Sequence, residues 1–407
     1  MIPSWFEKVK RAGVNVWRWQ PLRRALALYL LARVALSLWA ALVLWLVPAE
    51  TGPALERPFF NITPLDRGLA GWLLGPWQRF DTVHYITLAT SGYQAHTVQT
   101  VFPPFYPLLI RIIGDMLGRQ YLLAALLISN VCAVGYLAVL FVLAGQEVGP
   151  QAARKTQLYA LLYPWAFVLL AGYSESLFLL LVALAFWAAW RGRGLAAGVC
   201  GALAALTRLQ GGALVLPLLF LAWWRYRRGP SRAGPQPPPV LSLLRLDFLW
   251  PFLPAVASAG FLLGRAAAGI EPIAVTYATL WQHTSAPPWV GMSANVRNML
   301  VGVAHPTDYL DLVAAGFAAV LVLIAWRRLH PAYALYMTIA WLFDVSHIRT
   351  PHPMCSVGRH MIELFPIFFL LGRWGERSAW INRLIVYPSL SLWLWLSGQF
   401  VLWGWVG

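Results

Sequence analysis

Charged residues are scarce in this sequence of 407 residues. Asp, Glu, Lys and Arg make up 11% of it and hydrophobic residues 59%, whereas roughly 25% of an average soluble domain is charged. This shortage excludes a soluble globule. The 23 Trp, 15 Tyr and 20 Phe are residues of the types that gather at the two faces of a bilayer. The composition therefore predicts a polytopic protein of the cell membrane.

Acidic residues are fewer than basic ones, 15 against 31, which gives a formal net charge of +16. Such an excess also occurs in proteins that bind nucleic acid. Here the basic residues form short clusters between apolar runs, which is typical of loops that orient a membrane protein. The pattern excludes a nucleic acid as partner.

Cysteine is rare as well. Cys132, Cys200 and Cys355 lie far apart and form no CxxC pair, which excludes a disulfide framework and a zinc site of that type. We expect them to be small buried hydrophobic residues.

The motifs of several common activities are missing. There is no GxxxxGK[ST] loop, no HExxH, no GxSxG and no dinucleotide-binding fingerprint. ATP-driven transport, zinc-dependent proteolysis, serine hydrolysis and NAD chemistry therefore lack their characteristic residues. Chemistry on a substrate carried by a lipid remains.

Long apolar runs are abundant, and a spanning helix needs about 20 such residues. Candidate spans, long and short, are 25–47, 121–144, 156–171, 174–190, 249–268, 310–326, 331–345, 360–373 and 384–403. The stretch 195–224 is too long for one span and has basic flanks, so it predicts two helices that turn at 207–212. The total is about eleven spans in a single all-α membrane domain, 1–407, with 104–118 as a candidate interfacial or re-entrant helix.

The distribution of basic residues predicts the orientation of the chain. With the N-terminus in the cytoplasm, 20 Lys and Arg lie inside and 10 outside, and positive charge favours the inner side. The large outer loops are then 48–103, which we expect to carry interfacial helices, and 269–309. The inner segment 225–248 is rich in Pro and predicts a linker.

The first outer loop carries the strongest candidate for catalysis. In the run RFDTVHY (79–85), Asp81 shares one helix face with His84 and Tyr85, at spacings i, i+3 and i, i+4. A carboxylate beside an imidazole can act as a general base. The alternative is an aspartate that only caps its helix.

Further candidates stand at the outer starts of predicted helices. Pro103, Pro104 and Pro107 fix the backbone around Tyr106, where the next helix begins. Glu175 follows a Tyr-Pro break in the preceding span. It is either a site residue or the cap of its helix.

Two arginines are candidates for binding a phosphate. Arg208 lies at the tip of the predicted hairpin, and Arg359 and His360 stand at the outer start of the span 360–373. Arginine binds phosphate oxygens through two parallel hydrogen bonds, so both arginines would suit a lipid phosphate. Either could instead satisfy helix carbonyls.

Histidines gather between the last predicted spans. His347, His352 and His360, with Asp344 nearby, are of residue types that bind metals. Their spacing predicts no metal site, and we expect polar packing at the membrane interface instead.

Taken in order, these segments resemble the PIG-V type mannosyltransferases, which include the second mannosyltransferase of GPI-anchor assembly and many bacterial relatives. Four blocks carry the resemblance: RFDTVHY (79–85) with SGY (91–93); FPPFYP (102–107); YP (163–164) with YSES (173–176); and LTR (206–208) with RH (359–360) and FP (365–366). Phe80 stands where we expect Trp in the family, and Pro104 where Gly is common.

The resemblance implies a GT-C fold and an inverting transfer of mannose from a polyprenyl-phosphate sugar to a hydroxyl of a glycolipid or glycan at the outer face. Inverting transfer needs one base, which the resemblance places at Asp81. We expect no metal or other cofactor, because phosphate leaves without protonation and the sequence has no DxD pair; a bound divalent ion is the alternative. We expect the substrate to contact His84, Tyr85, Tyr106, Glu175, Arg208, Arg359 and His360. Loop 269–309, with Trp281, His283 and Trp289, is a candidate cover for the site; the alternative, and the more common use of such rings, is an aromatic belt at the membrane interface.

A lipid or sugar transporter is the main alternative, because charges within the membrane also mark transport paths. Inverted repeats with paired broken helices would favour it, and the sequence shows none. A glycosyltransferase-like scaffold without activity is a third possibility.

Overall fold

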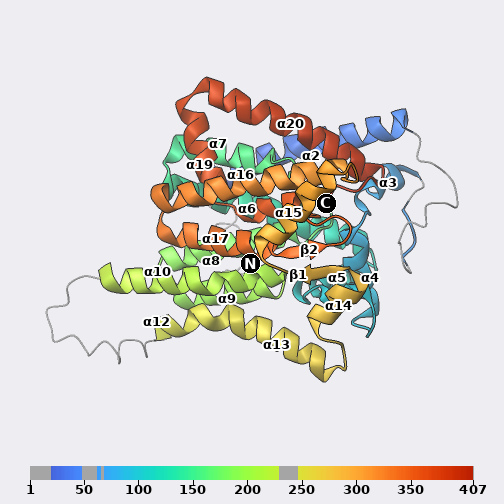
Figure 1. The fold of residues 1–407 in the computed structure, drawn as a ribbon, viewed down its shortest axis with the longest axis horizontal. Helices are drawn as coiled ribbons and strands as arrows, with labels where there is room; N and C mark the ends of the chain where they lie inside the picture. The colour runs from blue at the N-terminus through green and yellow to red at the C-terminus, as the bar shows by residue number, and fades with distance from the viewer. Residues whose placement is uncertain (1–19, 48–61, 66–67, 229–245, 407) are drawn as a thin grey trace, which may run out of the picture.

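The computed structural model describes residues 20–47, 62–65, 68–228 and 246–406. Most of them are helical, and several long helices lie side by side in a bundle (Figure 1). The prediction of an all-α membrane protein is thereby confirmed. The proposed linker 225–248 falls largely outside the described residues, as do positions 48–61 of the first predicted outer loop.

The first half of the chain forms helices up to the predicted hairpin. Its elements are α2 (Gln20–Leu46), α3 (Gly68–Leu73), η1 (Gly75–Trp77), α4 (Asp81–Ser91), η2 (Val98–Val101), α5 (Phe105–Met116), α6 (Tyr121–Glu147), α7 (Pro150–Leu161), η3 (Ala166–Leu169), α8 (Glu175–Trp190), α9 (Gly194–Ala205), η4 (Leu209–Leu214) and α10 (Val215–Arg228).

The second half adds further helices and one short pair of strands. Its elements are α12 (Leu246–Leu249), η5 (Trp250–Phe252), α13 (Leu253–Ala267), α14 (Ile273–Leu280), β1 (His283–Ser285), α15 (Pro288–Leu300), α16 (Pro306–Arg328), α17 (Pro331–Val345), β2 (His347–Arg349), α18 (Val357–His360), η6 (Met361–Glu363), α19 (Ile367–Arg377) and α20 (Ala379–Val401).

Within the described residues, four helices are long and apolar enough to cross a membrane. They are α2, α6, α16 and α20, and α8 and α9 are shorter apolar helices. The predicted spans at 174–190 and 331–345 coincide with α8 and α17, and 195–224 does form two helices joined at η4. The total of about eleven spans stays a prediction.

Three predicted spans are not single helices, and proline is the reason in each. The span 156–171 ends early, because α7 stops at Leu161 before Pro164. The span 249–268 is interrupted by η5, and Pro251 in η5 and Pro254 in the first turn of α13 lack amide donors. The span 360–373 is divided between α18, η6 and α19, and Pro366 precedes α19.

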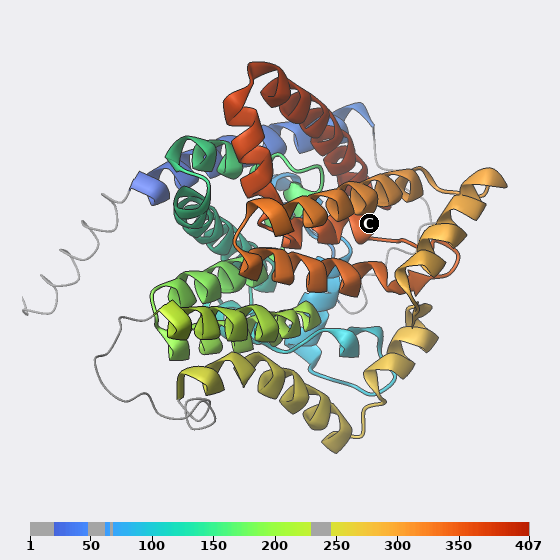
Figure 2. The same ribbon diagram turned by 60° about the vertical axis from the view of Figure 1, so that its left-hand side comes forward.

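The two outer loops of the prediction meet at one end of the bundle. The α4, α5, α14 and strand elements lie there, whereas the C-terminal end of α10 and α12 lie at the opposite end (Figure 1). The turned view shows the same separation (Figure 2). Strand β1, from the second loop, pairs antiparallel with β2, with His283 opposite Arg349. Through this pairing, the segment that precedes α18 lies against the second predicted outer loop.

Helix α8 lies at the centre of the packing. It contacts both α6 and α9, while α7 packs on α19. The consecutive residues Leu177, Phe178 and Leu179 of α8 are all buried, and because successive residues of a helix point in different directions, apolar side chains cover more than one of its faces. Its polar N-terminal residues therefore stand out within an apolar core.

Candidate active site

A cavity of about 130 Å³ lies among residues of α4, α14, α17, α18 and the two strands. Its polar lining comprises Asp81, Tyr85, Thr207, Arg208, Gln210, Tyr277, His283, Asp344, His347, Arg349, Ser356, Arg359 and His360. Aromatic rings of Phe102, Trp281, Phe343 and Trp405 complete its wall. Charged and aromatic groups thus converge on one small space.

Asp81 is the first residue of α4, and the turn before it is unusual. Phe80 has a φ of 46°, a value that is rare for a bulky residue and persists only where the surroundings hold it. Its ring lies 5.6, 5.3 and 5.7 Å from the rings of Phe400, Trp403 and Trp405. The C-terminal segment therefore fixes the turn that presents Asp81 to the cavity.

Asp81 is also held by Tyr173, which precedes α8. The Tyr173 hydroxyl accepts a hydrogen bond from the Asp81 amide at 3.4 Å. The carbonyl of Tyr173 accepts from Ser129 Oγ at 2.7 Å, and Tyr106 contacts the same Ser129 Oγ at 2.8 Å. Tyr106 is fully buried and does not line the cavity. Its contacts stabilise the site and are not open to a substrate.

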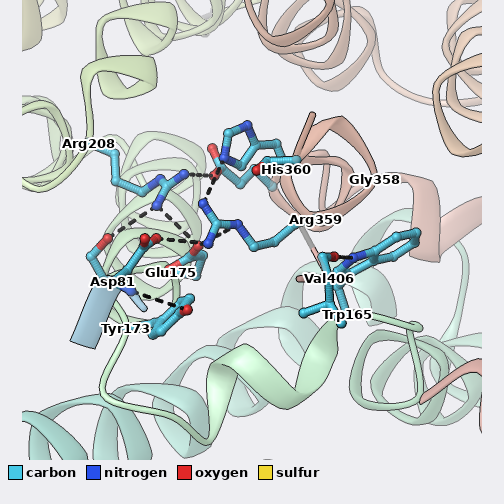
Figure 3. A network of polar contacts seen from close by, with 12 residues as sticks. Asp81, Trp165, Tyr173, Glu175, Arg208, Gly358, Arg359, His360 and Val406 are labelled. Atoms are coloured by element: carbon cyan, nitrogen blue, oxygen red, sulfur yellow. Dashed lines mark hydrogen bonds and ion pairs between the residues drawn. The ribbon is translucent and has the colours of Figure 1, made fainter. Parts of the chain in front are cut away.

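Buried ion pairs connect Asp81 to the core through alternating charges (Figure 3). Arg359 Nη1 lies 2.8 Å from Asp81 Oδ2, and its Nε lies 3.7 Å from Glu175 Oε1. Arg208 bridges Glu175 Oε1, at 3.2 Å, and Glu363 Oε1, at 2.8 Å. Glu175 therefore joins the two arginines.

Glu175 is fully buried beneath the cavity and does not line it. It is the first residue of α8, where a carboxylate is favoured by the helix dipole. The side chain makes no capping hydrogen bond to the backbone and instead faces the arginines. The contacts of Glu175 are therefore not those of a residue that only caps its helix.

The backbone around Arg359 is held on several sides. The Gly358 amide donates to Asp311 Oδ1 at 2.6 Å, and the Gly358 carbonyl accepts from the Tyr163 hydroxyl at 2.5 Å. A Cβ added at Gly358 would lie 2.5 Å from the Trp165 ring. The Trp165 indole itself donates to the Val406 carbonyl at 2.6 Å (Figure 3).

The far wall of the cavity carries a second buried carboxylate. Asp344 Oδ1 accepts from Gln210 Nε2 at 3.3 Å and lies 3.5 Å from His360 Nδ1. Asp344 Oδ2 is buried without a hydrogen-bond partner among the described residues. A buried acceptor of this kind is costly unless a ligand or water satisfies it.

Five of the eight residues expected at the site line the cavity: Asp81, Tyr85, Arg208, Arg359 and His360. Tyr85 also lies 2.6 Å from Ser174 Oγ. His84 points elsewhere, with Nδ1 at 3.4 Å from Gln99 Nε2 and its ring 5.4 Å from that of Trp281. Burial lowers the pKa of His84, and the nearby Asp81 opposes this shift.

The second predicted outer loop contributes to the cavity wall. Trp281 and His283 line it, whereas Trp289 is 71% exposed and does not. Burial, with the neighbouring charges of Arg349 and His347, lowers the pKa of His283 to about 4. His283 is therefore neutral at physiological pH.

Several lining residues were not among the expected site residues. Gln210 and Tyr277 carry no motif, and Trp405 lies near the end of the chain. Arg349 did stand in the sequence among the histidines before α18. Its position beside these histidines was the only hint in the sequence that it belongs to the site. The pairing of β1 with β2 places it in the wall of the cavity that Asp81 also lines.

The three histidines that cluster in the sequence, His347, His352 and His360, contact different partners. His352 Nδ1 lies 3.0 Å from Asp308, His347 Nδ1 lies 2.7 Å from the Phe343 carbonyl, and His360 faces Asp344. Across the described ranges of the chain, no three His, Cys, Asp or Glu residues gather as metal ligands would. Their contacts are those of polar packing.

Comparison with known proteins gives two matches. The sequence profile of the family Mannosyltransferase (PIG-V) matches residues 23–217, which include Asp81, Glu175 and Arg208 but not Arg359. The resemblance seen in the sequence is confirmed over that range. No curated protein matches the chain.

A solved structure matches as well. It is the crystal structure of ArnT from Cupriavidus metallidurans bound to undecaprenyl phosphate, with 17% identity and a TM-score of 0.44. The match covers 91% of this chain and 76% of that one.

Proposed function

We propose, because residues 23–217 match the PIG-V mannosyltransferases, that this protein is a membrane glycosyltransferase with its active site in the cavity at Asp81. Its donor is a polyprenyl-phosphate mannose and its acceptor a hydroxyl of a glycolipid or lipid-linked glycan. The architecture is of the GT-C type. One observation carries the proposal: Asp81 lies in a cavity with arginines, and its carboxylate touches Arg359 at 2.8 Å.

The proposed reaction is a single displacement with inversion. The acceptor oxygen forms a bond to C1 of the sugar while the bond from C1 to the phosphate oxygen breaks. The acceptor proton passes to Asp81, and the electron pair of the broken bond leaves with the polyprenyl phosphate. One base is sufficient, whereas a retaining mechanism needs a second carboxylate as nucleophile.

The contact of Asp81 with Arg359 gives this displacement an electrostatic advantage. The donor phosphodiester carries one negative charge and the product phosphate carries two. As Asp81 accepts the proton, it loses its own charge, and the positive charge of Arg359 becomes available to the leaving phosphate. Fixed charges aimed at a developing charge are a large source of catalysis in a site that excludes water.

The sugar is held by the opposite wall in this proposal. Hydrogen-bonding groups for the sugar hydroxyls come from Asp344, Gln210 and His360. Oδ2 of Asp344, which has no hydrogen-bond partner among the described residues, accepts from a sugar hydroxyl. The Tyr277 and Trp281 rings supply apolar surface for the sugar face.

No metal or other cofactor takes part in the proposed reaction. A lipid phosphate leaves without being protonated, so it needs positive charge nearby and no strong acid. The arginines of the cavity supply that charge.

We place the reaction at the outer face of the cell membrane. The excess of basic residues in the predicted inner loops supports this orientation. The cavity residues of α4, α14, β1 and β2 lie at the end of the bundle opposite α12 (Figure 1), which is consistent with it. The N-terminus is then cytoplasmic.

The test is transfer of labelled mannose from synthetic polyprenyl-phosphate mannose by the purified protein, with membrane lipid extract as acceptor. Asp81→Asn keeps the shape of the side chain but removes the base, so transfer should fall by about 10² to 10⁴. Asp115→Asn, an exposed site on α5, serves as matched control and should transfer normally. Equal transfer by Asp81→Asn and the wild type would refute the role of Asp81.

The same assay tests the activity class. A labelled glycolipid formed by the wild type supports the transferase. If the wild type neither forms a product nor binds the polyprenyl phosphate, the proposal is wrong and a transporter becomes the better interpretation.

A further inference from the structure

Arg349 occupies a distinct position in the cavity. It ends strand β2, opposite His283 of β1, and lines the same cavity as Asp81 and Arg359. The chain reaches this position only through the pairing of β1 with β2.

Three arginines line the cavity, and their counter-ions differ. Arg208 is paired with Glu175 and Glu363, and Arg359 with Asp81 and Glu175. Arg349 forms no ion pair with any carboxylate among the described residues. Of the three cavity arginines, Arg349 is thus the one that has no carboxylate within ion-pair distance in the described part of the chain.

The remaining contacts of Arg349 do not neutralise it. Nη1 donates to Cys355 Sγ at 3.3 Å, and a thiol is a weak acceptor. Nε is buried without a hydrogen-bond partner among the described residues. The guanidinium lies over the Trp405 ring, 5.3 Å from its centre. Such stacking holds the guanidinium plane and leaves its edge free to donate.

The histidines beside Arg349 do not neutralise it. His283 and His347 line the same cavity and carry no negative charge, and burial, followed by the charge of Arg349, lowers the pKa of His283 to about 4. A buried donor without a partner is costly, whereas two parallel hydrogen bonds from arginine to a phosphate are strong.

We propose that Arg349 binds the phosphate group of the polyprenyl-phosphate donor. This inference rests on the proposed function and deepens it by naming the phosphate subsite. It assigns a different role to Arg208, whose two carboxylate partners make it a structural link between Glu175 and Glu363. A phosphate held by Arg349 lies in the cavity that Asp81 and Arg359 share, so C1 of the sugar is brought to the base.

The experiment measures equilibrium binding of two labelled short-chain lipids, a polyprenyl phosphate and the corresponding uncharged polyprenol. The wild type should prefer the phosphate. Arg349→Gln should weaken binding of the phosphate by about 10- to 100-fold, because a charge-assisted hydrogen-bond pair is lost, and should leave polyprenol binding unchanged. Arg349→Lys keeps the charge without the fork and should recover part of the affinity.

Two controls make the result specific. Arg297→Gln removes an exposed arginine from α15 and should not change the preference. Inorganic phosphate, added as competitor, should fail to displace the labelled lipid at millimolar concentration; displacement at concentrations similar to those of the lipid would mean that free phosphate is the ligand and would overturn the proposal. Melting temperatures of all variants show that they are folded, and Arg349→Lys carries the test if Arg349→Gln is unstable.

Each failure has its own signature. An unchanged preference in both Arg349 variants, with the wild type still selecting the phosphate, would overturn the role of Arg349 and leave the transferase standing. A wild type that binds polyprenol and polyprenyl phosphate alike would overturn the subsite and the proposed donor together.

Discussion

The guanidinium Nη1 of Arg359 lies 2.8 Å from Oδ2 of Asp81, although 278 positions separate the two residues in the chain. Both side chains are largely buried, with 10% and 14% exposed. An ion pair in such surroundings is weakly screened by salt. It holds the proposed base and its countercharge in one place before a substrate binds.

Asp81 and Arg359 should act as a unit in transfer. Arg359→Gln should lower kcat by about 10² to 10³, the range for removing one donor aimed at a developing charge. In the double variant with Asp81→Asn, the loss should be much smaller than the product of the two single losses. Single-turnover transfer by the four proteins measures this coupling, and Arg327→Gln, exposed on α16, is the control. If the loss of rate in the double variant equals the product of the two single losses, the contact between Asp81 and Arg359 does not contribute to catalysis.

Glu175 should matter for stability more than any surface carboxylate. Glu175→Ala leaves Arg208 and Arg359 without their shared counter-ion in the core, and breaking a buried pair costs about 3–5 kcal/mol. The melting temperature of the detergent-solubilised protein should fall clearly. Glu376→Ala, on the exposed side of α19, should melt like the wild type. A Glu175→Ala protein with unchanged melting would contradict the described network.

Gly358 should tolerate no side chain. A methyl group there would lie 2.5 Å from the Trp165 ring and 2.9 Å from Asp311 Oδ1, so the backbone that carries Arg359 must shift. A misplacement of about 1 Å can cost on the order of 10²-fold in rate, and we expect such a loss for Gly358→Ala in the transfer assay. Gly316→Ala meets no neighbouring atom within 4 Å and should retain activity. Full activity of Gly358→Ala would mean that α18 is not held as described.

His283 should make stability depend on pH in the acidic range. Its pKa is lowered to about 4 by burial, whereas an unfolded histidine titrates near 6.5. Between these values the unfolded chain binds the additional proton, so stability falls as the pH decreases from about 6.5 to 4. His283→Gln should flatten this part of the melting curve against pH. Parallel curves for the variant and the wild type would contradict the burial of a neutral imidazole.

The sequence alone determined the class of this protein and the order of its helices. Spans such as 121–144 and 331–345 could be predicted because a bilayer demands long apolar helices and tolerates little else. The blocks around Asp81, Glu175 and Arg208 could be recognised because polar groups beside apolar runs are few. Breaks at Pro251 and Pro366 show the limit, since apolar composition does not reveal where a helix is interrupted.

Only the tertiary structure decided which of these residues face one cavity. Tyr106 and Glu175 stand in other blocks of the same family resemblance as Asp81, yet packing of α5 and α8 buries them below the site. Arg349 belongs to no motif, and the pairing of β1 with β2 carries it to the cavity. The physical reason is that local sequence sets helices and turns, whereas contacts between residues 278 positions apart depend on how all the helices pack.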